Sequence, residues 1–592
     1  MEVNFSNHIV KAKLIIITFA SLVSSEINGQ TPTIISFSPD SGAVGTLITI
    51  IGANLEKPTA FTVGGVNAIV VSDTSALISN YGDTLVGLIM PGSGTGVVSV
   101  TSAKGTGNGS GSFKVTATSY PSIQQGSKLV GTGAVGKAWQ GSSVSISADG
   151  NTAIVGGGND NSGTGTIWVY TRSGGVWTQQ GNKLVGSGAI GLARQGFVAI
   201  SADGNTAIVG GTGDNNGIGA AWIFTRSGGI WTQQGNKLVG TGAVGPTYVS
   251  QGSSVSISAD GNTAIVGGSG DNNHTGATWV FTRSNGVWSQ QGNKLVGTGY
   301  SELVSQGNTV AISADGNTVI VAGATDSNGA GPAWIFTRTD SIWTQQGNYL
   351  VGTGSTGSAN QQISVSISAD GNTAIVGGTT VNSGQGAAWI FTRSGGVWSQ
   401  QGNWLVGQGV VSQVSLGSSV SISADGNTAI VGGVGDNNNT GAVWVFTRLA
   451  GVWTQEGNKL VGTGAIGQAF QGMSVSLSAD GNTVIVGGDG DNSLTGASYI
   501  FASSITTGID EVVTIKNQLA IFPNPNNGRF TIQSANEGDY SIVNTFGEII
   551  QRLKLHASNN YTMNIENLSN GIYFFVGFNN NQMSEQKMVV TK

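Results

Sequence analysis

Six aspartates that recur along the sequence have the spacing of a cation-binding loop. Each lies eight residues before an aromatic residue, and oxygen-bearing residues follow at alternate positions, as Asn438 and Thr440 follow Asp436. Calcium takes alternating oxygen ligands of this kind. Each loop has a single carboxylate, so we expect weak calcium binding at best, and Asx turns explain the same residues without a metal. The six are Asp160, Asp214, Asp271, Asp326, Asp436 and Asp491.

A second set of aspartates lies in the repeated sequence SADGN, between a segment of alternating polarity and a continuous apolar segment. Asp-Gly is a strong hairpin signal, because a primed turn needs positive φ at its central residues. A calcium loop would need several carboxylates there, and each copy offers one. We therefore expect turns at Asp149, Asp203, Asp260, Asp315, Asp370, Asp425 and Asp480.

The spacing of these aspartates, 54 to 57 residues, indicates structural repeats that bury their faces against each other. Each repeat has four β-type segments and no helical period. Four strands in each of seven repeats predict an all-β, seven-bladed β-propeller over residues 120–504. The last repeat lacks its fourth strand, and a similar sequence at 120–131 precedes the first repeat. We expect this segment to complete the last blade and close the ring.

An arginine ends the third β-type segment in six repeats. The first and third turns of a four-stranded antiparallel blade share one face. We therefore expect each arginine to pair with a SADGN aspartate of its own or a neighbouring blade. The arginines are Arg172, Arg226, Arg283, Arg338, Arg393 and Arg448.

The composition excludes several classes of function. The chain has no cysteine, and its three histidines, His8, His274 and His556, fall in separate regions, so no triad or metal cluster is expected. We predict that the protein is not an enzyme and has no cofactor, with calcium left open. A net charge of −6 gives no basic surface for nucleic acid. Beyond the N-terminus, no apolar run approaches the roughly 20 residues of a transmembrane helix.

The loops that join one repeat to the next differ most in sequence. Variable loops on a constant scaffold are typical of binding surfaces, although neutral drift explains the same variation. Of the 14 tryptophans, 12 occupy two repeated columns that we expect to pack between blades, and only Trp139 and Trp404 lie outside them. The candidate ligand-binding residues are Lys137, Trp139, Arg194, Tyr248, Tyr300, Glu302 and Phe470.

The repeats resemble the bacterial FG-GAP-type propeller family in SVSISADGNTAIVGG, GATWVFTR and GVWTQQGNKLVG. Some relatives, such as the integrins, bind calcium, but the family's Phe-Gly pair survives here only near AFQG at 469–472.

Three further regions flank the repeats. Residues 1–29 have the basic start and short apolar run of a signal peptide. Residues 31–116 resemble the IPT/TIG family, an immunoglobulin-like β-sandwich, and its opening pattern is matched by Pro39, Gly42, Gly45 and Gly52. The glycine-rich stretch at 102–112 is expected to be a late loop of that domain.

After a linker at 505–517, residues 518–592 resemble the type A sorting domain of the type IX secretion system, expected to be a small β-sandwich. The resemblance implies export across the outer membrane, with the secretion machinery as a partner. The motif positions are Pro523, Asn524, Pro525, Gly528, Gly571, Ile572 and Tyr573.

Together these features predict a secreted or surface-displayed protein that binds an extracellular glycan or protein through one face of the propeller. Two alternatives are a polysaccharide-acting enzyme and a purely structural surface component. An acidic pair near the central channel would favour the enzyme.

Overall fold

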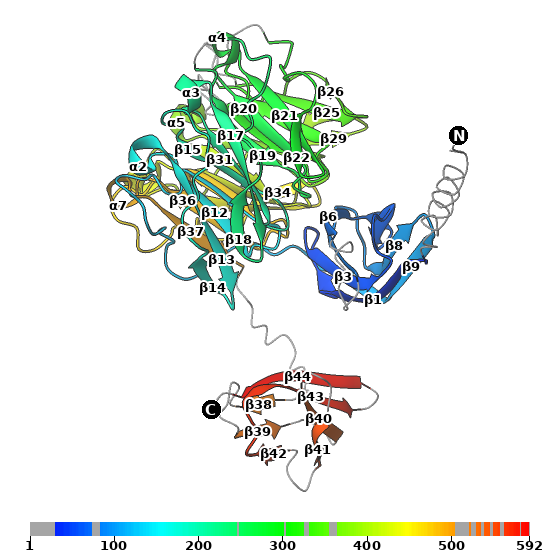
Figure 1. Cartoon of the computed structure of the whole chain (residues 1–592). Coiled ribbons are helices and arrows are strands. Elements are labelled where there is room, and N and C mark those ends of the chain that lie inside the picture. The colour runs from blue at the N-terminus through cyan, green and yellow to red at the C-terminus, as the bar shows by residue number, and fades with distance from the viewer. Residues whose placement is uncertain are drawn as a thin grey trace, which may run out of the picture. The chain divides into compact units, whose positions relative to one another are not determined.

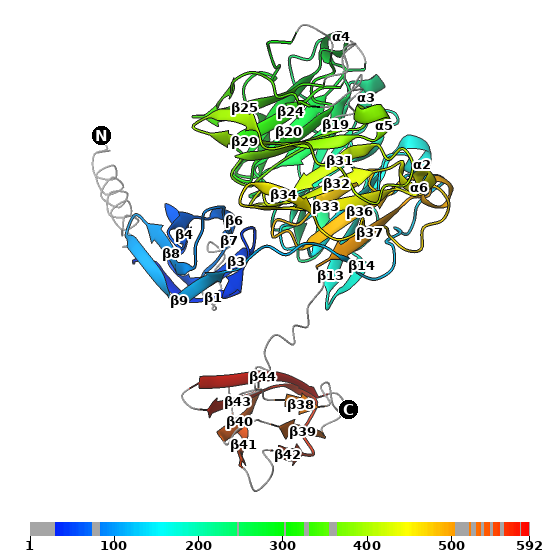
Figure 2. The same cartoon turned by 180° about the vertical axis from the view of Figure 1, so that it is seen from behind.

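In the computed structural model (Figures 1 and 2), the regular secondary structure of the described residues is almost entirely β-strand. It describes residues 30–73, 83–245, 248–300, 304–324, 331–354, 364–503, 520–522, 529–533, 538–544, 549–556, 562–579 and 582–590. The predicted signal peptide and linker lie outside these residues. The chain forms two compact units, Met1–Ser504 and Ile505–Lys592.

Seven antiparallel sheets of four strands account for the seven copies of SADGN. In each copy the aspartate closes the turn between the first two strands. Asp149 Oδ1 accepts the amide of Asn151 at 2.9 Å, and Gly150 has a φ of 65°, so the hairpin prediction is confirmed.

The first six sheets are β11 (Ser143–Ile146), β12 (Thr152–Gly157), β13 (Thr166–Ser173) and β14 (Val176–Gln179); β15 (Gln195–Ile200), β16 (Thr206–Gly211), β17 (Ala220–Ser227) and β18 (Ile230–Gln233); β19 (Gln251–Ile257), β20 (Thr263–Gly268), β21 (Ala277–Ser284) and β22 (Val287–Gln290); β23 (Thr309–Ile312), β24 (Thr318–Ala322), β25 (Ala333–Thr339) and β26 (Ile342–Gln345); β27 (Val365–Ile367), β28 (Thr373–Gly378), β29 (Ala387–Ser394) and β30 (Val397–Gln400); β31 (Leu416–Ile422), β32 (Thr428–Gly433), β33 (Ala442–Leu449) and β34 (Val452–Gln455).

The seventh sheet joins the two ends of the repeat region. It contains β35 (Ser474–Leu477), β36 (Thr483–Gly488), β37 (Ala497–Ala502) and the earlier strand β10 (Ile123–Gln124). β10 pairs antiparallel with β37, with Ile123 opposite Ala502. The prediction that residues 120–131 complete the last sheet is therefore confirmed.

Backbone hydrogen bonds connect the first strands of all seven sheets in a closed series. The amide of the alanine in each SADGN donates to the carbonyl of the next SADGN alanine, from Ala148 to Ala202 at 3.0 Å and onward. The series returns to its start when Ala479 donates to Ala148 at 3.1 Å. The repeats therefore form a ring in which each member bonds to its neighbours.

Serines of the neighbouring sheet accept backbone amides along the free edges of five of these first strands, β11, β15, β23, β31 and β35. The first strand of each sheet has one side without a partner strand, and its amides would be left unpaired there. Ser143 and Ser145 of β11 accept the amides of Val198 and Ile200 of β15 at 3.1 and 3.2 Å. The amide of Val144 in turn donates to Ser474 of the seventh sheet at 3.0 Å. The alternation of serine and apolar residues thus joins neighbouring sheets as well as facing the core.

The third-strand tryptophans pack between sheets, as predicted. Trp168 is fully buried in a cluster with Val144 of its own sheet and with Ile485 and Ile500 of the seventh. Gly131 packs against this indole ring, and a Cβ atom there would overlap it. This contact explains why the loop that packs on each of these rings has a glycine at that point.

Six four-residue turns assigned as helices are the part of the repeats that the sequence did not predict. Each follows the second strand, and all except α5 contain two consecutive residues with left-handed backbone, such as Asn161 and Ser162 at φ 50° and 58° in α2. Asparagine tolerates this conformation better than most residues, which explains the Asp-Asn sequences. The turns are α2 (Asp160–Gly163), α3 (Asp214–Gly217), α4 (Asp271–His274), α5 (Val381–Gly384), α6 (Asp436–Asn439) and α7 (Asp491–Leu494).

The N-terminal domain is a sandwich of two sheets around a core that includes Ile48, Phe61, Val98 and Phe113. One sheet has the order β1-β3-β7-β6, and the other β2-β9-β8-β4-β5. Its strands are β1 (Thr33–Ser38), β2 (Ser41–Gly42), β3 (Leu47–Ala53), β4 (Ala60–Val63), β5 (Val66–Asn67), β6 (Ile69–Asp73), β7 (Asp83–Leu88), β8 (Gly96–Ser102) and β9 (Gly105–Val115).

The predicted late loop at 102–112 is wrong. Most of it is strand β9, which pairs with β8. Glycine suits this strand because a Cβ atom at Gly107 would collide with the carbonyl of Pro32.

The C-terminal unit also contains two sheets, of orders β38-β39-β42 and β41-β40-β43-β44. Its core includes Ile532, Tyr540, Phe575 and Met588. The strands are β38 (Ala520–Phe522), β39 (Phe530–Gln533), β40 (Gly538–Asn544), β41 (Ile549–Leu555), β42 (Thr562–Ile565), β43 (Gly571–Asn579) and β44 (Gln582–Val590).

Three motif residues of this unit lie within the described part of the chain. Gly571, Ile572 and Tyr573 begin β43, and the Tyr573 hydroxyl donates to the carbonyl of Ser569 at 3.1 Å. Pro523, Asn524, Pro525 and Gly528 lie outside the described residues.

Replacing Ser145 by alanine should destabilise the protein by about 1 kcal/mol, because the amide of Ile200 loses its acceptor. Chemical unfolding of the full chain measures the effect. Ser173→Ala at the exposed end of β13 is the control and should change stability by less than about 0.5 kcal/mol. Equal effects of the two substitutions would contradict the proposed role of the serine bonds between sheets.

Candidate functional site

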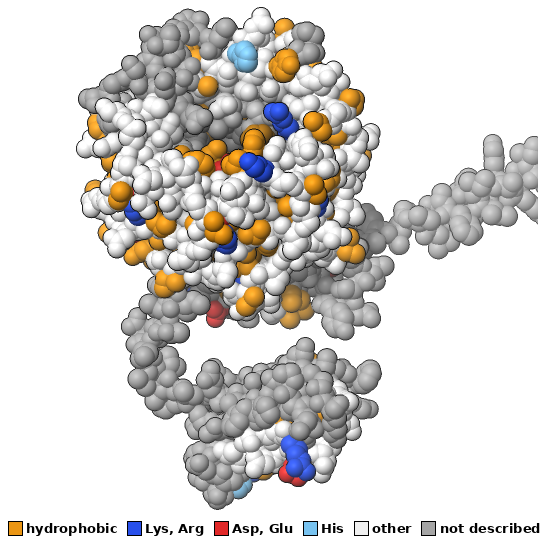
Figure 3. Space-filling model, turned by 90° about the vertical axis from the view of Figure 1, so that its left-hand side faces the viewer, with side chains coloured by type: hydrophobic (Ala, Val, Ile, Leu, Met, Phe, Trp, Pro, Cys, Tyr) orange, Lys and Arg blue, Asp and Glu red, His pale blue; other side chains and the backbone are white. Residues whose placement is uncertain are grey.

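The loops between repeats are hydrogen-bonded to the loops that contain α2 to α7, on one face of the ring. Asp160 Oδ1 accepts the amide of Val135 at 2.7 Å, and the carbonyl of Val135 accepts the amide of Asn161 at 3.0 Å. The variable loops and the loops with these aspartates therefore lie side by side. Figure 3 shows this face, with hydrophobic and basic side chains near its middle.

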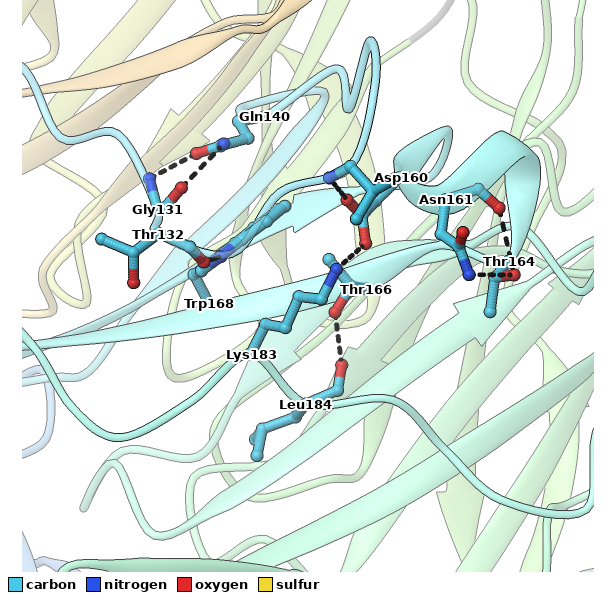
Figure 4. Close-up of polar contacts among 11 residues, drawn as sticks. Gly131, Thr132, Gln140, Asp160, Asn161, Thr164, Thr166, Trp168, Lys183 and Leu184 are labelled. Atoms are coloured by element: carbon cyan, nitrogen blue, oxygen red, sulfur yellow. Dashed lines mark hydrogen bonds and ion pairs between the residues drawn. The ribbon is translucent and has the colours of Figure 1, made fainter.

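Lysines form salt bridges with five of the six aspartates that the sequence suggests as calcium ligands. Lys183 Nζ lies 2.5 Å from Asp160 Oδ2, and Figure 4 shows this pair beside the Trp168 indole, which donates to the carbonyl of Thr132. The aspartate is 1% exposed. The same arrangement recurs in the pairs Lys237–Asp214, Lys294–Asp271, Lys459–Asp436 and Lys128–Asp491.

An ammonium group thus pairs with each of these five carboxylates and would have to be displaced by a calcium ion, and calcium binding stays a prediction. No cluster of three or more His, Cys, Asp or Glu side chains suited to a metal occurs among the described residues. Asp326 lies outside them.

The predicted pairing of the arginines with the SADGN aspartates is wrong. Arg172 Nε donates to Asn151 Oδ1 at 2.9 Å, and its guanidinium lies 5.5 Å from the centre of the Trp177 ring. Asp149 is instead occupied by the hydroxyl of Ser147 and the backbone of its own turn. Burial lowers the pKa of Arg172, and the negative charges of Asp149 and Asp480 oppose that shift without an ion pair. Arg172 Nη2 contacts Asp149 only through its backbone carbonyl, at 3.4 Å. The two groups share a face, as expected.

The channel at the centre of the ring is apolar. Its cavity of 190 Å³ is lined by the isoleucine or leucine and the alanine of every repeat, such as Ile146 and Ala148, together with Leu88. Leu88 and Met90 of the N-terminal domain belong to one apolar cluster with these alanines. No acidic side chain lines the described channel, so the feature expected of a glycosidase is missing there.

A groove of 550 Å³ lies where the loops of the first three repeats meet. Two of the predicted binding residues, Arg194 and Tyr248, line it, and the Tyr248 side chain is 70% exposed. We call it the Arg194 groove. Its other lining residues are Asn159, Ser162, Gly163, Leu192, Thr212, Gly213, Asn216, Gly217 and Ser250.

The remaining predicted binding residues lie apart from this lining. Lys137 is exposed, and its carbonyl accepts a hydrogen bond from the groove residue Asn159 at 2.7 Å. Trp139 is 41% exposed. Tyr300 packs edge-on against the buried Trp334 and so belongs to the core.

Phe470 is half-buried and packs over Gly490. Glu302 lies outside the described residues. Ser162 and Asn216 were missed because they stand in the repeated loop sequence after the second strand, and Asn159 was missed although most other repeats have glycine at its position.

Family models match both flanking domains. The IPT/TIG domain matches residues 32–127, and the secretion system C-terminal sorting domain matches residues 520–591. Both resemblances stated above are therefore confirmed, and the first match extends past 116 to include β10. The sorting domain indicates export to the cell surface or the extracellular space. The FG-GAP resemblance of the repeats stays a prediction.

Solved structures share only a distant likeness with this chain. Hydrazine synthase of Kuenenia stuttgartiensis is 14% identical with a TM-score of 0.38, covering 60% of this chain and 95% of that one. The periplasmic gluconolactonase of Pseudomonas aeruginosa is 18% identical with a TM-score of 0.38, covering 63% and 94%. An oligogalacturonate lyase in complex with manganese is 10% identical with a TM-score of 0.38, covering 66% and 98%.

Likeness at this level says nothing about activity. No curated protein matches the chain. Within the described residues, no helix is long and apolar enough to cross a membrane.

Lys237→Met should destabilise the protein by about 3 to 5 kcal/mol, because it leaves the buried carboxylate of Asp214 without its partner. Combining it with Asp214→Asn should recover most of the loss. Thermal unfolding measures both variants. Calcium or a chelator should leave the unfolding temperature of the parent chain unchanged, and a rise with calcium would restore the metal hypothesis.

Stability should depend on pH through Asp489, which follows β36. Burial raises the pKa of its carboxyl to about 6, above the ordinary 3.8. The folded state therefore holds this proton more tightly, so the contribution of Asp489 to stability falls as pH rises from about 4 to 6. Asp489→Asn should remove that decline and stabilise the chain by about 1 to 2 kcal/mol at pH 7, allowing for partial exposure.

Chemical unfolding at several pH values checks this difference. The control is Asp340→Asn at an exposed turn, which should not alter the slope. An unchanged slope in Asp489→Asn would contradict the assignment.

Proposed function

We propose that this chain is a secreted or surface-displayed protein that binds an extracellular glycan or protein without catalysis. The observation that carries the proposal is the Arg194 groove, where two variable loops bring Arg194 and Tyr248 together on a rigid framework. Arginine and tyrosine are enriched among residues that dominate binding energies. The sorting domain supports an extracellular setting for the ligand.

We further propose that the seven sheets form a closed seven-bladed β-propeller of FG-GAP type. The support is the hydrogen-bonded series of alanines that returns from Ala479 to Ala148, together with β10 in the seventh sheet. A closed ring holds the loops of neighbouring repeats at a fixed spacing, which is what a groove between repeats requires.

The polysaccharide-acting enzyme is the weaker alternative. General acid and base groups at a defined separation would be needed, and neither the described channel nor the Arg194 groove has an acidic side chain in its lining. The purely structural component stays as the second alternative, since a groove without a ligand would also fit it.

A glycan and protein array probed with the purified full chain, with and without calcium, tests the binding proposal. We expect binding that does not depend on calcium. Arg194→Ala and Tyr248→Ala should each weaken it by at least about tenfold. The control is Arg552→Ala, an exposed arginine in the C-terminal unit, which should bind like the parent chain. An array without any bound ligand would overturn the proposal and favour the structural alternative.

A further inference from the structure

We propose that the Arg194 groove binds a saccharide that carries a carboxylate group. This inference rests on the proposed binding function and names the class of ligand for the same site. Arg194 would hold the carboxylate, the Tyr248 ring would stack on the sugar, and neutral amide and hydroxyl groups would contact the sugar hydroxyls.

The charge of the groove favours an anion. Its lining contains one cation, Arg194, and no acidic residue. The nearest repeated carboxylates, Asp160 and Asp214, are 1% exposed and each is paired with a lysine. Within the described chain, Arg194 forms no ion pair. A guanidinium offers two parallel N–H donors, which match the two oxygens of a carboxylate.

The framework holds Arg194 in place but does not require an arginine. Its backbone has a φ of 55°, and its amide donates to the carbonyl of Gly163 at 2.9 Å. The fourth and sixth repeats have Ser305 and Ser415 at the equivalent position, with φ of 49° and 51°. Like Arg194, each lies just before a residue that forms an isolated β-bridge to the neighbouring loop. A small residue therefore satisfies the loop, and the charged side chain at 194 is free to serve binding.

Tyr248 is held by its neighbour in a comparable way. Its φ is 59°, a conformation that costs a bulky residue about 1 to 2 kcal/mol. Gly217 lies beneath it, and a Cβ atom there would come within 3.0 Å of Tyr248 Cδ1. The ring is thus supported from below by a glycine and exposed above, as a stacking surface for a pyranose ring requires.

The other lining groups favour a sugar over an acidic peptide. Asn159, Ser162, Thr212, Asn216 and Ser250 offer amides and hydroxyls, and Leu192 is the one aliphatic side chain larger than a methyl group in the lining. Neutral donors and acceptors of this kind match sugar hydroxyls, whereas peptide sites depend more on apolar pockets for side chains. The volume of 550 Å³ falls within the ordinary range for small ligands.

Calorimetry of the full chain with a uronate trisaccharide, and with the same trisaccharide as its methyl ester, tests the inference. The ester keeps the ring and its hydroxyls, and it removes the charge by placing a methyl group on the carboxyl. We expect the free acid to bind at least about tenfold more tightly than the ester. Arg194→Ser, which the fourth and sixth repeats show to be compatible with the loop, should abolish this preference while leaving weak binding of both compounds.

Two further variants separate the roles of the side chains. Arg194→Lys keeps the charge but loses the paired donors, so its preference for the acid should be intermediate. Tyr248→Ala should weaken the acid and the ester by similar factors. Thermal unfolding of each variant should match that of the parent chain, because both side chains are exposed.

The outcomes distinguish the inference from the proposed function. Equal binding of acid and ester, or tighter binding of an acidic peptide than of the trisaccharide, would overturn the ligand class and leave the binding function standing. An absence of binding by every compound, together with an empty array, would overturn both. A preference for the acid that survives Arg194→Ser would move the site away from this groove.

Discussion

The unpaired edge of the first strand in each sheet is the constraint on which the repeat region depends. A strand with one open side exposes a row of amides and carbonyls, and burial without partners is costly. Here serines of one sheet accept amides of the next at five of the seven junctions, and the SADGN alanines bond in a series that returns to its start. Each bond is available only when the neighbouring sheet is in place, so the sheets stabilise one another as a ring.

Most of the charged residues that the sequence suggests as chemically active instead stabilise the repeat region. The buried aspartates pair with lysines and anchor the loops between repeats, and the arginines of the third strands bind Asn151 and its equivalents. A side chain that makes the same contact in five or six sheets stabilises the ring, so repetition distinguishes structural residues from candidate ligand-binding residues. A ligand site must come from residues that break the repeat.

The Arg194 groove contains residues that break the repeat. Arg194 stands where other repeats have serine, and Arg194 and Tyr248 both project from backbone that the framework already holds in the left-handed region. Because the loops are fixed by buried Lys–Asp pairs, the two side chains can differ without disturbing the fold. The apolar channel, in contrast, is lined by the same residues in every repeat and lies against Leu88 of the N-terminal domain.

The sequence by itself determined the number of sheets, the hairpin at each SADGN, the strand at 120–131 that completes the last sheet, and both flanking families. These follow from periodic patterns and local turn chemistry, which depend on neighbours in the chain. The arginine partners, the Lys–Asp pairs and the strand at Gly105–Val115 were decided only by the tertiary structure, because each depends on distances between residues far apart in sequence. Arg194 and Tyr248 were found as variable residues, but their meeting in one groove required the ring to bring two loops together.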